Sequence, residues 1–175
     1  MKNILIILLF AVLTPIATQA QSSVNKFFNK HSGHEGAISV DIGGLLIKMV
    51  AKVAADEHET TEILSDINRL QVLVLEDQSP ITNKEMSGFV DKLHQDKFEE
   101  LMTIRTGEMN VNFFIKEKKD MITNVLILVK EADNFIMLNL KGKIKFSDLQ
   151  KLDFDVQGSE HFKKIPKKKE DVPRA

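Results

Sequence analysis

The chain has 175 residues, a formal net charge of −1, and no cysteine, tryptophan or tyrosine. This length suits one compact domain. The near-neutral charge argues against a nucleic-acid-binding domain, which carries a basic excess. The lack of cysteine excludes disulfides, thiolate metal sites and cysteine nucleophiles.

The first segment, residues 1–20, is typical of a secretory signal peptide. Lys2 is a basic start, Ile4 to Val12 is an unbroken apolar run, and Thr18 to Ala20 ends in small residues. This order predicts cleavage before Gln21 and an exported protein, periplasmic or secreted, that is soluble after cleavage. The apolar run is shorter than the about 20 residues of a membrane-spanning helix, and an uncleaved anchor is the alternative interpretation.

The rest of the chain is predicted to form a single domain over residues 21–160, followed by a basic tail over residues 161–175. The tail contains Pro166 and Pro173 and shows no apolar periodicity, which predicts disorder. Contact of its lysines with an anionic surface is a second interpretation.

The first half of the domain contains three predicted helices and two predicted strands. Residues 22–30 have a helical pattern, residues 37–40 a strand pattern, and residues 70–75 an apolar run typical of a strand covered on both faces. Thr82 and Glu85 form a capping-box pattern that opens a helix.

The remaining helix lies between the two predicted strands. It is predicted over residues 42–53 from apolar residues at three- and four-residue spacing, with Asp41 as its N-cap. Gly43 and Gly44 either let the helix start approach another backbone or delay the helix until Leu45.

From Glu100 onward the period becomes strand-like, and the links between runs are short and polar, which favours an antiparallel meander. Residues 141–143 are predicted to turn the chain, and residues 147–150 to open a short helix. The fold class is therefore α+β, an antiparallel sheet with a C-terminal four-strand meander, one or two earlier strands and two main helices packed on one face. The runs of the meander are 101–106, 111–116, 121–129 and 135–140.

These segments resemble, in order and spacing, the bacterial domain-of-unknown-function family 4252. The likeness covers roughly residues 37–155 and includes ISVDIGGLLIKMVAK, LQVLVLED, EELMTIRTGEMNVNFFIKE, ITNVLILV and NFIMLNLKGKI. It implies an exported α+β domain of unknown activity and transfers no catalytic residue. Many members of the family have a lipid-anchoring cysteine after the signal, and this chain has none.

The strongest metal candidate is the motif His31-x-x-His34-Glu35, because two imidazoles and a carboxylate can bind zinc. The spacing is not that of a helical zinc-protease motif, and Gly33 and Gly36 predict a solvated loop instead. No serine-nucleophile turn or phosphate-binding loop is present. We therefore predict no catalytic, cofactor-binding or metal-binding residue and no enzymatic activity.

The predicted function is that of a non-enzymatic envelope protein that binds a protein partner or assembles. A polar strip on the sheet and the edge strands are the candidate contacts. The alternative is a small carrier or sensor for an apolar ligand, with phenylalanine and methionine lining its pocket; a hydrolase comes third. The strip consists of Asn110, Asn112, Lys116, Thr123 and Asn124.

The signal-peptide prediction has a direct test. We expect N-terminal sequencing of the protein recovered from the envelope or medium of its own cells to begin at Gln21, because signal peptidase cleaves after small residues. Recovery of a chain that still begins at Met1 would contradict export.

Overall fold

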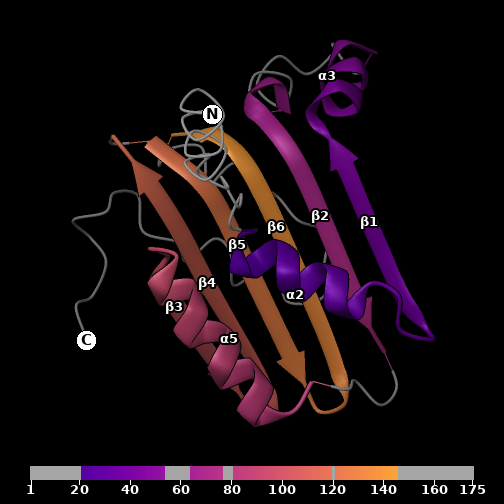
Figure 1. The fold of residues 1–175 in the computed structure, drawn as a ribbon, viewed down its shortest axis with the longest axis vertical. Coiled ribbons are helices and arrows are strands. Elements are labelled where there is room, and N and C mark those ends of the chain that lie inside the picture. The colour runs from indigo at the N-terminus through magenta and orange to yellow at the C-terminus, as the bar shows by residue number, and fades with distance from the viewer. Residues whose placement is uncertain (1–20, 54–63, 77–80, 120, 146–175) are drawn as a thin grey trace, which may run out of the picture.

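The computed structural model describes residues 21–53, 64–76, 81–119 and 121–145. The predicted signal peptide, the helix predicted at residues 147–150 and the tail lie outside these residues. The described residues form a six-stranded antiparallel sheet in the order β1-β2-β6-β5-β4-β3 (Figure 1), so the predicted antiparallel α+β class is confirmed. The elements are α2 (Ser23–His31), β1 (Ala37–Gly43), α3 (Gly44–Val53), β2 (Ile67–Leu75), α5 (Asn83–Gln95), β3 (Glu99–Thr106), β4 (Met109–Lys118), β5 (Met121–Glu131) and β6 (Asn134–Ile144).

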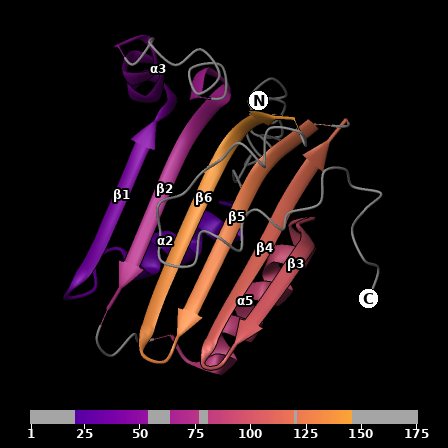
Figure 2. The same cartoon turned by 180° about the vertical axis from the view of Figure 1, so that it is seen from behind.

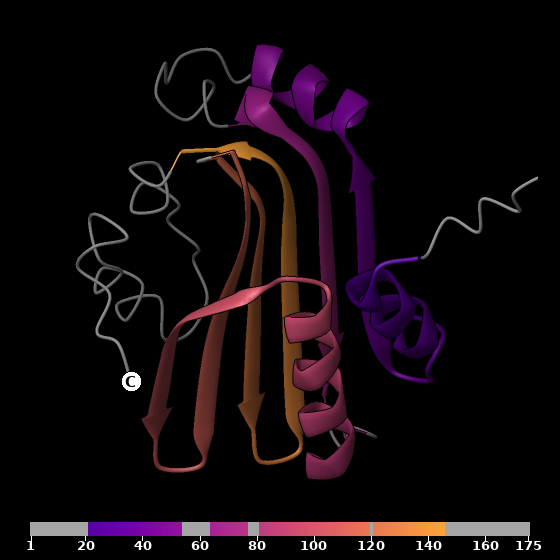
Figure 3. The same ribbon diagram turned by 60° about the vertical axis from the view of Figure 1, so that its left-hand side comes forward.

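One face of the sheet is covered by α2 and α5, which cross it side by side (Figure 3). Phe27 of α2 stacks on Phe89 of α5 with ring centroids 4.0 Å apart, and Phe27 also contacts Phe135 of β6. These rings join the two helices to the sheet in one apolar core. The core also contains Val24, Phe28, Leu73, Leu75, Ile81, Leu93, Phe98, Phe114, Leu126, Leu128 and Met137.

The opposite face of the sheet is apolar as well, and none of the described helices crosses it (Figure 2). Successive side chains of a strand point to opposite faces, so the register places Val40 of β1, Val72 of β2 and Leu138 of β6 in one row here. A second apolar cluster extends from this row toward β4 and β3. Its buried members are Ile47, Ile67, Leu101, Val111, Phe113, Ile115, Ile122, Val125, Ile127, Leu140 and Ile144.

A helix forms within residues 42–53, as predicted, and this is α3. The prediction that it packs on the face of the sheet was wrong. α3 follows β1 without a loop and lies beyond the ends of β1 and β2 (Figure 3). Asp41 is part of β1 and is not a helix cap. The place on the sheet beside α5 belongs to α2, which buries Val24, Phe27 and Phe28 in the core there.

Two glycines allow backbone contacts that a side chain would prevent. A Cβ at Gly44 would lie 2.8 Å from the carbonyl oxygen of Asn68, which confirms that the helix start approaches another backbone. A Cβ at Gly142 would overlap the carbonyl oxygen of Asp66. The predicted turn at residues 141–143 was therefore wrong, because β6 continues through Gly142 and pairs there with Ile67.

The two-residue hairpin loops provide a stability test. The β3–β4 loop begins with Gly107 at φ 59°, whereas the β5–β6 loop begins with Ala132 at φ 44°. The left-handed region costs a residue with a Cβ about 1–2 kcal/mol, partly offset by glycine's greater entropy when unfolded. We expect Ala132→Gly to raise the free energy of unfolding by about 0.5–1 kcal/mol in urea titrations. The matched change Gly107→Ala should lower it, and equal effects of the two changes would contradict this explanation.

Candidate functional site

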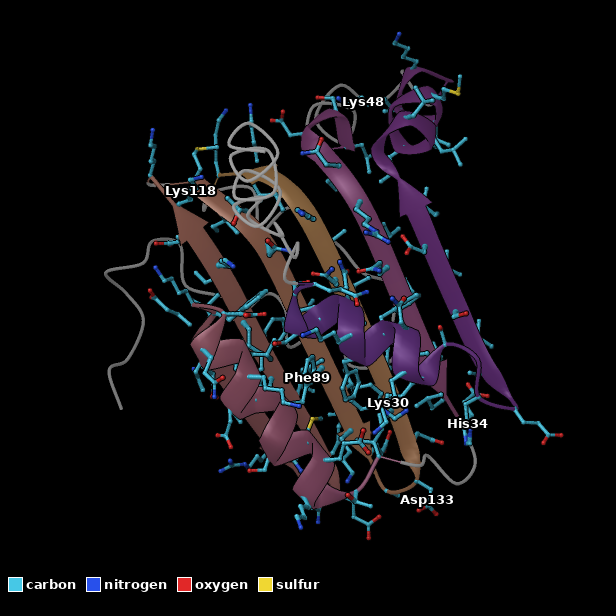
Figure 4. All side chains as sticks on the ribbon, in the orientation of Figure 1. Lys30, His34, Lys48, Phe89, Lys118 and Asp133 are labelled. Atoms are coloured by element: carbon cyan, nitrogen blue, oxygen red, sulfur yellow. The ribbon has the colours of Figure 1, made fainter. Side chains whose placement is uncertain are left out.

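The residues of the candidate metal motif do not come together. His31 lies at the end of α2 and is buried, with Nε2 2.9 Å from Oε1 of Glu85 on α5. His34 and Glu35 are exposed in the following loop, and His34 lies toward the first residues of β1 (Figure 4). The residues that the structure describes contain no group of three histidine or carboxylate side chains arranged to hold a metal ion.

Glu85 instead holds α2 and α5 together. Lys30 donates a hydrogen bond to the same Oε1 atom at 2.6 Å, and this bond, followed by that of His31, lowers the pKa of Glu85. The Glu85 backbone N–H donates to Oγ1 of Thr82 at 3.2 Å, so this half of the predicted capping box is confirmed. The Glu85 side chain reaches across to α2, and its role is structural.

A shallow groove between α2 and α5 has a volume of about 240 Å³. Phe27 and Lys30 of α2 and Phe89 of α5 are among the residues that line it, and Lys30 and Phe89 are labelled in Figure 4. Pockets for small molecules usually measure about 300–1,000 Å³ and are mostly apolar. This groove is smaller and is also lined by Lys26, Lys92 and Glu85, so it suits an apolar ligand poorly.

The polar strip predicted on the sheet lies on the face that α2 and α5 cover. Asn112 is half-buried and donates to Oγ1 of Thr103 at 2.8 Å, and the ammonium group of Lys116 lies 5.6 Å from the centre of the Phe98 ring. Thr123 donates to the backbone carbonyl of Lys116. Asn112, Lys116 and Thr123 thus each have a partner within the fold.

A buried polar row crosses the sheet on the same face and was not predicted from the sequence. Asn139 of β6 donates to Gln71 of β2 at 2.9 Å, and Gln71 donates to Asp41 of β1 at 3.0 Å. Gln71 is fully buried. A buried amide needs hydrogen-bond partners, and each member of the row supplies one to the next. The row therefore ties the edge strand β1 to the sheet.

The row ends in a bidentate ion pair between Asp41 and Arg69. Arg69 donates from Nε and Nη2 to the two carboxylate oxygens at 2.8 and 2.6 Å. These hydrogen bonds lower the pKa of Asp41 below its ordinary value of 3.8. The only charged side chain of β1 is thus neutralised by its neighbour strand.

The most unusual surface of the molecule is apolar and lies at the β1 edge. Leu45, Leu46, Met49 and Val50 form one side of α3, and their exposed fractions range from 56% to 74%. The opposite side of the helix, with Ile47 and Ala51, is buried, which reverses the burial expected from the periodicity. We call the exposed part the α3–β1 surface: Leu45, Leu46, Met49 and Val50 of α3 with Ile38 and Val40 of β1.

The orientation of α3 follows from Gly44. Because the backbone of Gly44 contacts Asn68, the helix begins directly over the first residues of β2. Ile47 and Ala51 then point toward β2, and the wider apolar side points away from the sheet. Lys48 and Lys52 flank that side, and Lys48 lies on α3 beyond the sheet (Figure 4). None of the helices within the described ranges has the length and apolar character of a membrane span.

The ion pair at the β1 edge predicts a pH-dependent stability. The pKa of Asp41 is lower in the folded protein than its ordinary value of 3.8. The ion pair therefore contributes fully to the free energy of unfolding above pH 3.8, and this contribution is lost as the pH falls through the pKa of the folded state. We expect Asp41→Asn to reduce the free energy of unfolding at pH 7 by about 0.5–1 kcal/mol, a size typical of partly exposed pairs. In urea titrations the difference from the wild type should shrink below pH 3.8. A constant difference, or the same behaviour for the exposed control Glu108→Gln, would contradict this role.

Most of the chain matches one known family. A family model described as "Domain of unknown function (DUF4252)" matches residues 28–152, which include every described strand. Neither the comparison with curated proteins nor that with solved structures gave a match. The match spans most of the chain and the whole sheet, and the chain therefore belongs to the DUF4252 family.

Proposed function

We propose that this protein is a non-enzymatic, exported protein of the cell envelope that acts by binding a protein partner or by assembling through its α3–β1 surface. The observation that carries the proposal is the exposure of Leu45, Leu46, Met49 and Val50 on one side of a single helix. Contiguous apolar residues on a surface commonly mark sites of interaction.

The neighbouring strand supports a protein as the partner. β1 is an edge strand of the described sheet, so among the described residues half of its backbone N–H and C=O groups have no partner strand. An edge strand next to exposed apolar side chains offers the two components of strand addition, which are backbone hydrogen bonds and side-chain contacts. Ile38, Val40 and Ile42 form an apolar row on one face of β1. Half-buried apolar side chains of β2 lie beside this row, so the apolar surface continues from the edge toward the middle of the sheet.

The carrier alternative has weaker support than the binding proposal. Its ligand would need an enclosed apolar pocket, and the groove between α2 and α5 is small and bordered by three lysines and a glutamate. The two aromatic rings in the groove stack on each other, so they serve the core.

Site-specific photocrosslinking in intact cells tests the proposal. A photoreactive residue at Met49, in the full-length protein, should give a discrete protein adduct. The double change Leu46→Lys and Val50→Lys should abolish it, because charge on an exposed apolar surface opposes contact without removing buried packing.

The control places the same chemistry on another exposed helix surface. A photoreactive residue at Ser87 should not give the adduct, and Ser87→Lys with Gln95→Lys should leave the Met49 adduct unchanged. No adduct from Met49, or an equal yield from both positions, would overturn the proposal.

A further inference from the structure

We propose that the occupant of the α3–β1 surface is a second copy of this chain, joined by antiparallel pairing of the two β1 strands around a two-fold axis at Val40. This inference rests on the proposed function and specifies its partner. Three features of the molecule support it: the two sheet edges differ, β1 is complementary to itself, and the charges around α3 are complementary to those before β1.

The two edges of the sheet differ in their protection. The β3 edge carries Glu99, Glu100 and Arg105, and its register shifts between Glu100 and Met102. Charges and bulges of this kind keep an edge from pairing with another sheet. β1 pairs with β2 over seven residues without a register shift, contains no proline, and has its single charge neutralised by Arg69.

A single open edge favours a closed pair over a fibre. Continuous stacking of sheets requires two compatible edges, whereas a two-fold dimer uses the same edge of both copies. The protected β3 edge would thus stop growth after two copies, and the result would be a twelve-stranded sheet, twice the six of one chain.

The sequence of β1 is complementary to itself when it is centred on Val40. In this register Val40 lies opposite Val40 of the second copy, and Ile38 lies opposite Ile42. All seven residues are paired, and Asp41 lies opposite the uncharged Ser39, so no like charges face each other. A register centred on Asp41 would instead place two carboxylates opposite each other and would pair fewer residues.

The antiparallel arrangement also uses the remaining exposed apolar residues. Ile38 lies near the start of β1, whereas α3 follows the end of β1. Pairing in opposite directions brings Ile38 of one copy beside the α3 start of the other, where Leu45 and Leu46 are exposed. Both ends of the contact then bury apolar side chains.

The charges next to the strand are complementary in the same register. Glu35 is exposed in the loop two residues before β1, and antiparallel pairing brings this loop to the end of the second β1, where α3 begins. Lys48 is exposed on that part of α3. The acidic Glu35 of each copy thus lies on the side of the basic α3 of the other, once at each end of the strand pair.

The test measures the mass of the exported wild-type protein and of variants at Val40 by analytical ultracentrifugation. The wild type is expected to sediment as a dimer. Val40→Lys and Val40→Glu are each expected to sediment as monomers, because each places like charges opposite each other at the two-fold axis. An equimolar mixture of the two should restore a dimer that contains one copy of each. Thr106→Lys on the exposed β3 edge is the matched control and should remain dimeric.

Disulfide trapping tests the register independently, because the chain has no cysteine of its own. Val40→Cys alone should form a crosslinked dimer on oxidation, whereas Ile38→Cys should crosslink only when it is mixed with Ile42→Cys. Urea titration of each variant shows that it is folded. A monomeric wild type, or a dimer that Val40→Lys leaves intact, would overturn the inference.

The outcomes separate this inference from the proposed function. A monomer that still gives a Met49 adduct with a different protein retains the proposed function and refutes the second copy. A monomer that binds vesicles of phosphatidylglycerol, with binding lost in Leu46→Glu/Val50→Glu, would refute both and would indicate a membrane surface. A dimer that is broken at Val40 supports both.

Discussion

The backbone contact between Gly44 and Asn68 determines what this protein presents to its surroundings. Because no Cβ intervenes, α3 begins directly after the last residue of β1 and lies across the first residues of β2. The narrow side of α3, with Ile47 and Ala51, is then buried, and the wider apolar side is left exposed. A bulkier residue at position 44 would displace the helix, and the α3–β1 surface would not form in its present shape.

The second requirement is that β1 remains on the sheet, since an edge strand has a neighbour on only one side. The row from Asn139 through Gln71 to Asp41 supplies this attachment with side-chain hydrogen bonds in addition to those of the backbone. Arg69 completes the row and neutralises Asp41. The same interaction that attaches the strand therefore removes the charge that would protect its open edge.

The strands of the second half were predictable because their apolar runs are long and their links are short, as residues 111–116 within β4 show. Gly142 was misread as a turn, because a glycine that ends a strand and one that admits a neighbouring carbonyl look alike in sequence. Gln71 was missed within an apolar run because its partner Asn139 is 68 residues away. The exposed side of α3 was also missed, since periodicity shows that a helix is two-sided but not which side meets the sheet.

The sequence by itself determined the α+β class, the antiparallel strands and the family, because these depend on local periodicity and on the order of segments along the chain. Only the tertiary structure decided that His31 serves the contact between α2 and α5, that the polar residues of β4 are used within the fold, and that α3 is apolar toward the outside. The reason is physical: burial and hydrogen bonding depend on which distant residues meet, and a close contact such as that of Gly44 with Asn68 is a property of the folded chain.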